Sequence, residues 1–183
     1  MSFQRRQRSA VVFEQEDTLS RLDSFVRRLQ AQKACLEQAA VLIQTVSGPV
    51  LELGLGNGRT YDHLRELLPD REIFVFERRV SAHAACIPDE AHLILGDVSD
   101  TLPAAGERIA TPAALAHIDC GTDDAERNAA LALEIAHKLA PLMGRGGVVV
   151  SDQRMSHQDW EPLALPEGVA EGRYYMYCCN VPG

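Results

Sequence analysis

The sequence has no apolar stretch long enough to cross a membrane, and its N-terminus lacks the apolar core of a secretory signal peptide. It contains only five cysteines, an odd number, and none of them form a C-x-x-C pair. This pattern argues against a disulfide framework and against a zinc site. Repeats and low-complexity tracts are also absent. We therefore expect a protein of a reducing compartment, the cytoplasm, that does not bind to membranes.

Basic charge is scarce, because 18 Lys and Arg residues face 26 Asp and Glu residues and give a formal net charge of −8. Nucleic-acid affinity depends on clustered basic side chains that release counterions, so nucleic acid is disfavoured as a partner. Residues 1–33 are an exception, with seven basic and four acidic side chains. We interpret this local excess as a solvated helix face, and a recognition patch for an acidic substrate is the alternative.

With 183 residues, of which 46% are hydrophobic, the chain can bury a sizeable core as one domain. We divide the predicted domain, residues 1–183, into three parts. An N-terminal helical segment covers residues 1–47, a core covers 48–152, and a C-terminal strand region covers 153–183.

The most informative segment runs from Val50 to Thr60 and reads VLELGLGNGRT. An apolar run ends at an acidic residue, glycines follow at every second position, and a helical pattern then begins. This order predicts a strand, a tight turn and a helix. Glycines in such a turn let the backbone approach a ligand closely, and the free N–H groups of the helix face the same space.

This segment resembles motif I of the class I S-adenosylmethionine-dependent methyltransferases, an acidic residue followed by Gly-x-Gly-x-Gly. The alternative is a dinucleotide site of an NAD(P)-dependent oxidoreductase, whose fingerprint is Gly-x-Gly-x-x-Gly. Arg59 occupies the third glycine position of that fingerprint, which favours the methyltransferase form. A glycine-rich turn without a ligand is the remaining interpretation.

Two further acidic residues follow predicted strands at the spacing of this family. Glu77 ends the run from Glu72 to Phe76, and Asp97 ends the run from His92 to Leu95. The resemblance implies that Glu77 accepts hydrogen bonds from the ribose hydroxyls, unless it is a solvated partner of Arg78 or Arg79. It also implies that Asp97 accepts from the adenine amino group and that the Val98 N–H meets a ring nitrogen.

The resemblance thus implies S-adenosyl-L-methionine as cofactor. The implied contacts come from the glycine segment and the strand ends: Glu52, Gly54, Gly56, Asn57, Gly58, Arg59, Thr60, Glu77, Arg78, Asp97, Val98 and Asp119.

The chain order predicts an α/β fold, a Rossmann-like, doubly wound and mostly parallel sheet with N-terminal helices and a C-terminal antiparallel strand. Asp17 or Thr18 can cap the first helix, and a second apolar set begins at Cys35. Further elements are predicted downstream: a strand over 113–119, a well-buried helix over 125–142, a turn over 144–147, a strand over 148–152 and a last strand over 173–179. Residues 163–165 are the candidate partner of the last strand.

The predicted activity is transfer of a methyl group to a small-molecule acceptor by in-line displacement at the methyl carbon. Such a reaction needs alignment above all, and a base where the acceptor must lose a proton. Asp119 and Asp152, each at a strand end, are the predicted catalytic residues. Other candidates at the mouth of the cleft are Asp123, His157, Tyr174 and Tyr175, each of which could instead be a cap, a surface group or a packing residue.

Two alternatives remain at this stage. Asp119 with Asp152 and Gln153 is similar to the acidic residue and Asp-Asn pair with which catechol-type O-methyltransferases hold Mg²⁺, although Gln153 departs from that pattern. The second alternative is a module that binds the cofactor without catalysis and acts as a regulatory partner. A homo-oligomer is compatible with either.

Overall fold

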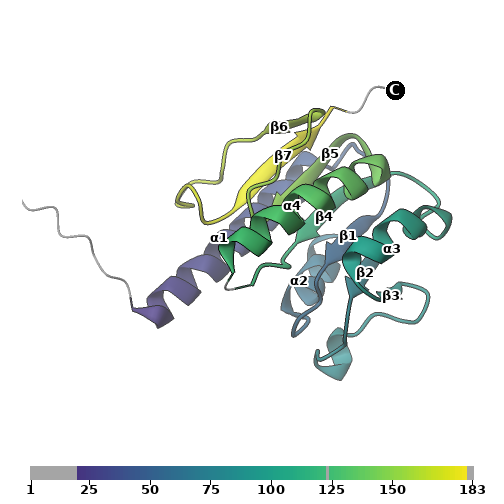
Figure 1. The fold of residues 1–183 in the computed structure, drawn as a ribbon, viewed down its shortest axis with the longest axis horizontal. Helices are drawn as coiled ribbons and strands as arrows, with labels where there is room; N and C mark the ends of the chain where they lie inside the picture. The colour runs from purple at the N-terminus through teal and green to yellow at the C-terminus, as the bar shows by residue number, and fades with distance from the viewer. Residues whose placement is uncertain (1–19, 123, 181–183) are drawn as a thin grey trace, which may run out of the picture.

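A seven-stranded sheet with the order β3-β2-β1-β4-β5-β7-β6 forms the centre of the computed structural model, which describes residues 20–122 and 124–180 (Figure 1). The strands are β1 (Val50–Leu53), β2 (Ile73–Glu77), β3 (Leu93–Leu95), β4 (Ala113–Ile118), β5 (Met143–Ser151), β6 (Trp160–Pro162) and β7 (Tyr175–Cys179). The α-helices are α1 (Arg21–Leu42), α2 (Arg59–Leu67), α3 (Val98–Ala104) and α4 (Ala125–Leu139). Short 3-10 turns lie at Ala84–Cys86, Ala105–Glu107 and Ala140–Leu142.

The sheet reverses its order of growth between β1 and β4. Strands β1 to β3 extend it in one direction, the chain then returns to place β4 beside β1, and β5 extends it the other way. These five strands are parallel, whereas β7 pairs antiparallel with both β5 and β6. The predicted doubly wound sheet with a C-terminal antiparallel strand is therefore confirmed.

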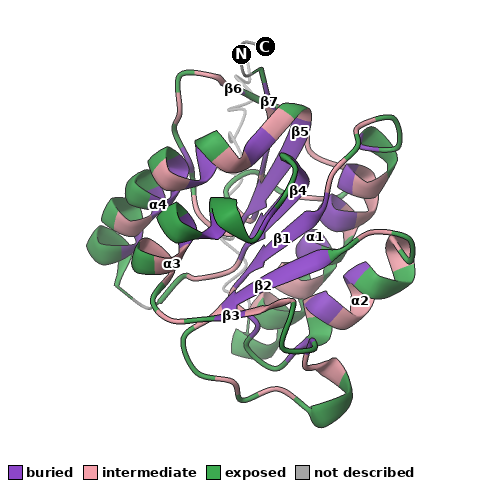
Figure 2. Ribbon diagram, turned by 90° about the vertical axis from the view of Figure 1, so that its right-hand side faces the viewer, coloured by how far each residue is buried: buried purple, intermediate pink, exposed green. Residues whose placement is uncertain are grey.

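Helices cover both faces of the sheet. Figure 2 shows α1 and α2 on one face and α3 and α4 on the other. Two hydrophobic clusters correspond to these layers, one under α1 and α2 and one under α3 and α4. Every residue of β1 and β4 is buried, which is the expected state of parallel strands covered on both sides.

Helix α1 joins the two apolar sets predicted near the N-terminus into one element of 22 residues. Ser20 is its N-cap and accepts a hydrogen bond from the Asp23 N–H at 3.0 Å. The predicted caps, Asp17 and Thr18, lie outside the described residues. No helix in residues 20–122 and 124–180 combines the length and apolarity that spanning a bilayer requires.

Three sequence expectations about the second half of the chain were wrong in detail. Helix α4 is buried on one face only, because many of its apolar residues are alanines that tolerate exposure, and Leu133 is exposed. The glycines of 144–147 lie inside β5, where Gly144 and Gly147 bring its backbone against the carbonyl groups of β4. The partner of β7 is Trp160–Pro162 because Trp160 fills the core, and the pairing then reaches Leu163 through a single hydrogen bond to Met176 O.

Arg71 holds the end of α1 against the start of the sheet. Its guanidinium donates to the carbonyl oxygens of Ile43 at 2.8 Å, Val46 at 2.7 Å and Gly48 at 2.7 Å. These carbonyls follow the last turn of α1, where helical partners are missing. One side chain therefore satisfies three backbone acceptors and sets how α1 approaches β1.

We expect Arg71→Ala to lower the free energy of unfolding by about 2–4 kcal/mol, because hydrogen bonds from a charged donor are lost and partly buried acceptors lose their partner. Urea denaturation measures the change. Lys33→Ala removes a solvent-exposed pair with Glu37 and is the control, with an expected change of about 0.5 kcal/mol or less. Equal losses in the two variants would contradict this role of Arg71.

Candidate functional site

The carboxyl ends of the parallel strands open into one cleft at the β1/β4 reversal, where ligands of doubly wound sheets bind. The cleft has a volume of about 530 Å³. It is lined by the loops after β1, β2, β3 and β4 together with one side of α4: Gly54, Gly56, Phe76, Glu77, Arg78, Gly96, Asp97, Val98, Ser99, Asp119, Cys120, Gly121, Thr122, Arg127, Ala130, Leu131 and Glu134.

A smaller pocket of about 170 Å³ adjoins this cleft and shares three of its lining residues, Gly54, Gly56 and Asp119. Helix α1 and the start of α2 close its other sides. The remaining lining residues are Phe25, Arg28, Leu29, Gln32, Leu55, Asn57, Arg59 and Thr60. The glycine loop therefore separates a large compartment from a small one that α1 covers.

Glycine is required at two positions of this loop. Gly54 has a φ of 97°, and a Cβ there would lie 2.6 Å from the Asp119 carbonyl oxygen. Gly58 has a φ of 84° and is the N-cap of α2, with a Cβ position 2.4 Å from Cys86 Cβ. Without side chains at these points, the loop after β1 can pack against the loop after β4 at Gly54 and against the connection between β2 and β3 at Gly58.

Glu77 supports the same loop from the end of β2. Its carboxylate accepts from the N–H groups of Leu55 at 2.9 Å, Gly56 at 3.1 Å and Arg79 at 2.9 Å. Burial alone would raise the pKa of Glu77, but these backbone donors outweigh it, and the pKa lies below its ordinary value. A fixed negative charge therefore lies at the edge of the cleft.

Asp97 and Val98 begin α3 at the far side of the cleft. The Asp97 carboxylate caps the helix by accepting from the Ser99 N–H at 3.0 Å. Asp97, Val98 and Arg78 all line the large compartment, so the structure brings the predicted strand-end residues together.

Glu52 lies underneath the glycine loop and not in the cleft. It is fully buried, and its carboxylate accepts from the Thr60 hydroxyl and pairs with His117, with Oε2 at 2.7 Å from Nδ1. The two residues are register partners on β1 and β4. The other ring nitrogen, Nε2, lies 2.9 Å from the Tyr174 hydroxyl, which also accepts from Gln32 Nε2 at 2.8 Å.

This buried group was not predicted from the sequence, although a signal existed. His117 is the one polar residue in the apolar run of β4, and Glu52 has the same place in β1. Burial would lower the pKa of His117, but the charge and hydrogen bond of Glu52 raise it above its ordinary value. A raised histidine pKa stabilises the fold below about pH 6.5, and this contribution is lost as the pH rises through the folded-state pKa.

The predicted catalytic residues Asp119 and Asp152 lie at neighbouring strand ends and share Arg28 of α1. The Arg28 guanidinium donates to Asp119 Oδ1 and lies 3.9 Å from Asp152 Oδ2. Gln32 donates to the other Asp119 oxygen at 3.0 Å. The interpretation of the basic N-terminal residues as a solvated helix face is therefore wrong for Arg28.

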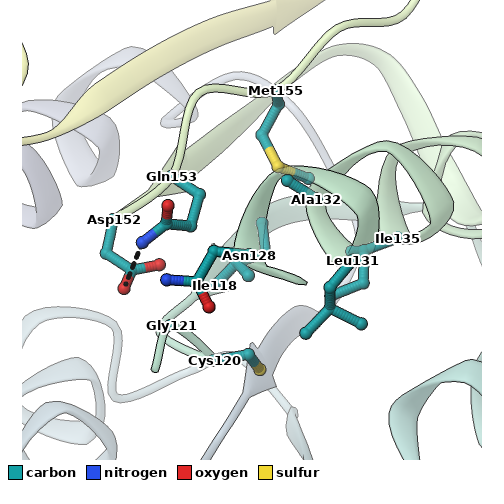
Figure 3. A pocket seen from close by; sticks show the side chains of 10 residues that line it. All are labelled: Ile118, Cys120, Gly121, Asn128, Leu131, Ala132, Ile135, Asp152, Gln153 and Met155. Carbon is teal, nitrogen blue, oxygen red and sulfur yellow. Dashed lines mark hydrogen bonds between the residues drawn. The ribbon is translucent and has the colours of Figure 1, made fainter. Parts of the chain in front are cut away.

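Asp152 has an unusual environment for a carboxyl group. Its burial first, and the nearby charge of Asp119 second, raise its pKa from 3.8 to about 6, although Gln153 and Arg28 oppose the shift. Its Oδ1 is buried without a partner among the described residues. Figure 3 shows the Asp152 carboxylate hydrogen-bonded to the Gln153 amide beside a small pocket. This pocket has a volume of about 10 Å³, the lower limit for one water molecule.

A third compartment opens on the other side of Asp152. It has a volume of about 660 Å³ and touches both α1 and the segment before β7. Its lining is mostly polar: Arg28, Gly121, Thr122, Asp152, Gln153, Gly172 and Arg173. Arg28 thus borders this compartment and also the small pocket under α1.

The remaining sequence candidates are not brought to this cleft. Tyr174 is fully buried in the group around His117 and is not a wall of the cleft. His157 packs against His137 and Trp160, and Tyr175 pairs with Ser151 across the sheet. Asp123 lies outside the described residues, and the N-cap of α4 is Asp124.

The sequence and the fold were compared with known protein families and solved structures. The family described as S-adenosyl-L-methionine methyltransferase matches residues 19–179. An S-adenosyl-L-methionine methyl transferase from Silicibacter pomeroyi DSS-3 is 47% identical, with 88% of this chain and 99% of that chain covered and a TM-score of 0.84. Human methyltransferase-like protein 13 in complex with SAH shares the fold at 13% identity, covering 85% of this chain and 82% of that chain with a TM-score of 0.52. Among proteins of curated function, none matches the sequence.

We expect Asp152→Asn to stabilise the protein at pH 7.5 by on the order of 1–3 kcal/mol. A carboxyl group with a raised folded-state pKa binds more protons in the folded chain than in the unfolded one, so stability falls as the pH rises from about 4 to 6. The amide of the variant is neutral at every pH and does not lose this stability. The difference in stability between the variant and the wild type should therefore vanish below pH 4, where the wild-type carboxyl group is also neutral.

Urea denaturation between pH 3.5 and 8 measures this difference. Asp70→Asn, at an exposed turn, is the control and should follow the wild type. An Asp152→Asn variant that is less stable than the wild type at pH 7.5 would rule out a strained, base-like carboxylate at this position.

Proposed function

We propose, from the premise that the chain belongs to the S-adenosyl-L-methionine methyltransferase family, that it methylates a small molecule at an ionisable oxygen or nitrogen. The chain is an S-adenosyl-L-methionine-dependent methyltransferase by this membership. The nature of the acceptor and the roles of single residues are our proposals. The family and the 47% identical relative are both methyltransferases, which favours this activity over the oxidoreductase alternative.

The cofactor fits across the two compartments that the glycine loop separates. In this arrangement adenosine lies in the large cleft, with Glu77 accepting from the ribose hydroxyls. Asp97 accepts from the adenine amino group, and the Val98 N–H meets the ring. The methionyl part lies in the small pocket, where the N-terminus of α2 attracts its carboxylate.

The residues of the glycine loop then have two kinds of role. Asn57, Arg59 and Thr60 line the small pocket and are positioned to contact the methionyl group. Glu52 acts from below, because its buried carboxylate holds Thr60 and His117 in place. We therefore assign Glu52 to the support of the loop and not to direct contact with the cofactor.

The position of Asp152 carries the proposal for the chemistry. It is a carboxyl group with a pKa of about 6 on the wall of the open compartment, and its neighbours Arg28 and Asp119 line the small pocket. A base with a pKa near the working pH transfers protons most efficiently. The acceptor proton passes to the Asp152 carboxylate, the acceptor lone pair forms a bond to the methyl carbon, and the electrons of the carbon–sulfur bond pass to sulfur.

Size and charge support a small acceptor. The open compartment of about 660 Å³ lies within the range of small-molecule sites. The net charge of −8 disfavours a nucleic-acid substrate. Alignment of the acceptor with the methyl group in such a pocket can lower the barrier by roughly 7–11 kcal/mol.

Asp152→Asn should separate cofactor binding from chemistry. We expect its Kd for S-adenosylhomocysteine, measured by calorimetry, to stay within about threefold of the wild type. Transfer of labelled methyl from S-adenosylmethionine to the small-molecule fraction of a cell extract should fall by about 10²–10⁴-fold, the usual contribution of a general base. The control is Glu161→Gln, at an exposed position of β6, which should change neither the Kd for S-adenosylhomocysteine nor the methyl transfer. Label that appears only in macromolecules would contradict a small acceptor.

Glu77→Ala should weaken binding of S-adenosylhomocysteine by about 10–100-fold, the value of hydrogen bonds to a charged acceptor. Thermal shift offers a second readout, because S-adenosylmethionine and S-adenosylhomocysteine should raise the Tm of the wild type while NAD and NADP leave it unchanged. An unchanged affinity of Glu77→Ala for S-adenosylhomocysteine would contradict a contact between Glu77 and the ribose.

A further inference from the structure

We propose that Arg28 supplies the positive charge between Asp119 and Asp152 that a divalent cation would otherwise supply, so that the acceptor site works without a metal ion. This inference rests on the proposed function for its catalytic meaning. The position of the guanidinium itself is a structural property that can be tested separately.

The two aspartates do not fit Mg²⁺ in this structure. Mg²⁺ requires oxygen ligands in near-octahedral geometry at 2.0–2.1 Å. One oxygen of Asp119 accepts from Arg28 and the other accepts from Gln32. Asp152 Oδ2 faces Arg28 and accepts from the Gln153 amide nitrogen at 3.2 Å. Of the four carboxylate oxygens, only the buried Oδ1 of Asp152 lacks a partner among the described residues, and one free oxygen does not make a Mg²⁺ site. Residues 20–122 and 124–180 contain no group of three or more His, Cys, Asp or Glu side chains that could hold a metal ion.

Arg28 is held in this place by the geometry of α1. Ser24, Arg28 and Gln32 follow each other at intervals of four residues and therefore lie on one face of the helix. Each bonds to a distant part of the chain. Arg173 donates to the Ser24 hydroxyl at 3.1 Å, and Arg28 and Gln32 donate to Asp119. This polar seam directs the guanidinium into the space between the strand ends.

The positive charge of Arg28 also suits an acceptor oxygen that becomes negative during the reaction. Arg28 contributes one positive charge to a pair of carboxylates that lie next to the expected sulfonium. Because Arg28 borders both the small pocket and the open compartment, its guanidinium can hold the acceptor oxygen as that oxygen loses its proton to Asp152. A planar guanidinium binds an oxygen anion through directed N–H donors. An acceptor with an acidic hydroxyl, such as a phenol or an enol, suits this arrangement.

Mn²⁺ is the probe for the cation position, and thermal shift is the measurement. We expect MnCl₂ to leave the Tm of the wild type unchanged, and to raise the Tm of Arg28→Ala by about 3 °C once Mn²⁺ exceeds its Kd several-fold. The rise should disappear in the double variant Arg28→Ala/Asp152→Asn. Arg27→Ala, which removes the neighbouring exposed arginine, and Arg28→Lys, which keeps the charge, should both resemble the wild type.

Two results would overturn the proposal. One is a Mn²⁺-dependent rise in the wild type that Asp152→Asn abolishes, and the other is an Arg28→Ala variant that folds but does not respond to Mn²⁺. Methyl transfer by the wild type should also be unchanged by EDTA. Failure of the proposed function is a separate outcome, since it would appear as a lack of S-adenosylhomocysteine binding in the wild type whatever the Mn²⁺ result.

Discussion

A fully buried Glu52–His117 pair at the point where the sheet reverses is the interaction on which the site depends. Charged groups without solvent must be paired and hydrogen-bonded, and removal of one partner from such a pair costs about 3–5 kcal/mol. Here Glu52 holds the start of α2 through Thr60. His117 contacts Tyr174, the residue before β7, and Tyr174 in turn accepts from Gln32 of α1. The pair therefore joins the cofactor loop to the elements that form the acceptor side.

The strand-end carboxylates above this pair have different electrostatic environments, and this difference divides their roles. Backbone N–H donors lower the pKa of Glu77 despite its partial burial, which suits a permanent acceptor for a neutral hydroxyl. Burial and a neighbouring carboxylate raise the pKa of Asp152 to about 6, which suits a group that takes up a proton. Carboxylates at the ends of two strands of one sheet can thus serve binding and proton transfer in neighbouring compartments, which share Gly121 and Thr122.

Much of the fold followed from local sequence patterns, because parallel strands read as apolar runs and glycine turns have strict spacing. The strand-end positions of Glu77, Asp97, Asp119 and Asp152 were predictable for the same reason. What the sequence did not reveal depends on tertiary contact. The direction of Arg28 is set by how α1 crosses the sheet, and the pairing of Glu52 with His117 is set by the register of β1 against β4. From the sequence alone, Arg28 is read as a solvated helix residue and His117 as an ordinary strand residue. Their contacts become visible only once α1, β1 and β4 are placed in the fold.

The central claim is that the methyl donor spans the glycine loop with its sulfur directed toward Asp152 and Arg28. A crystal structure with S-adenosylhomocysteine bound tests it most directly. Our account predicts adenosine beside Glu77 and Asp97, the methionyl group under α1, and the sulfur facing the open compartment. Adenosine placed outside the cleft, or a sulfur directed away from Asp152, would contradict it.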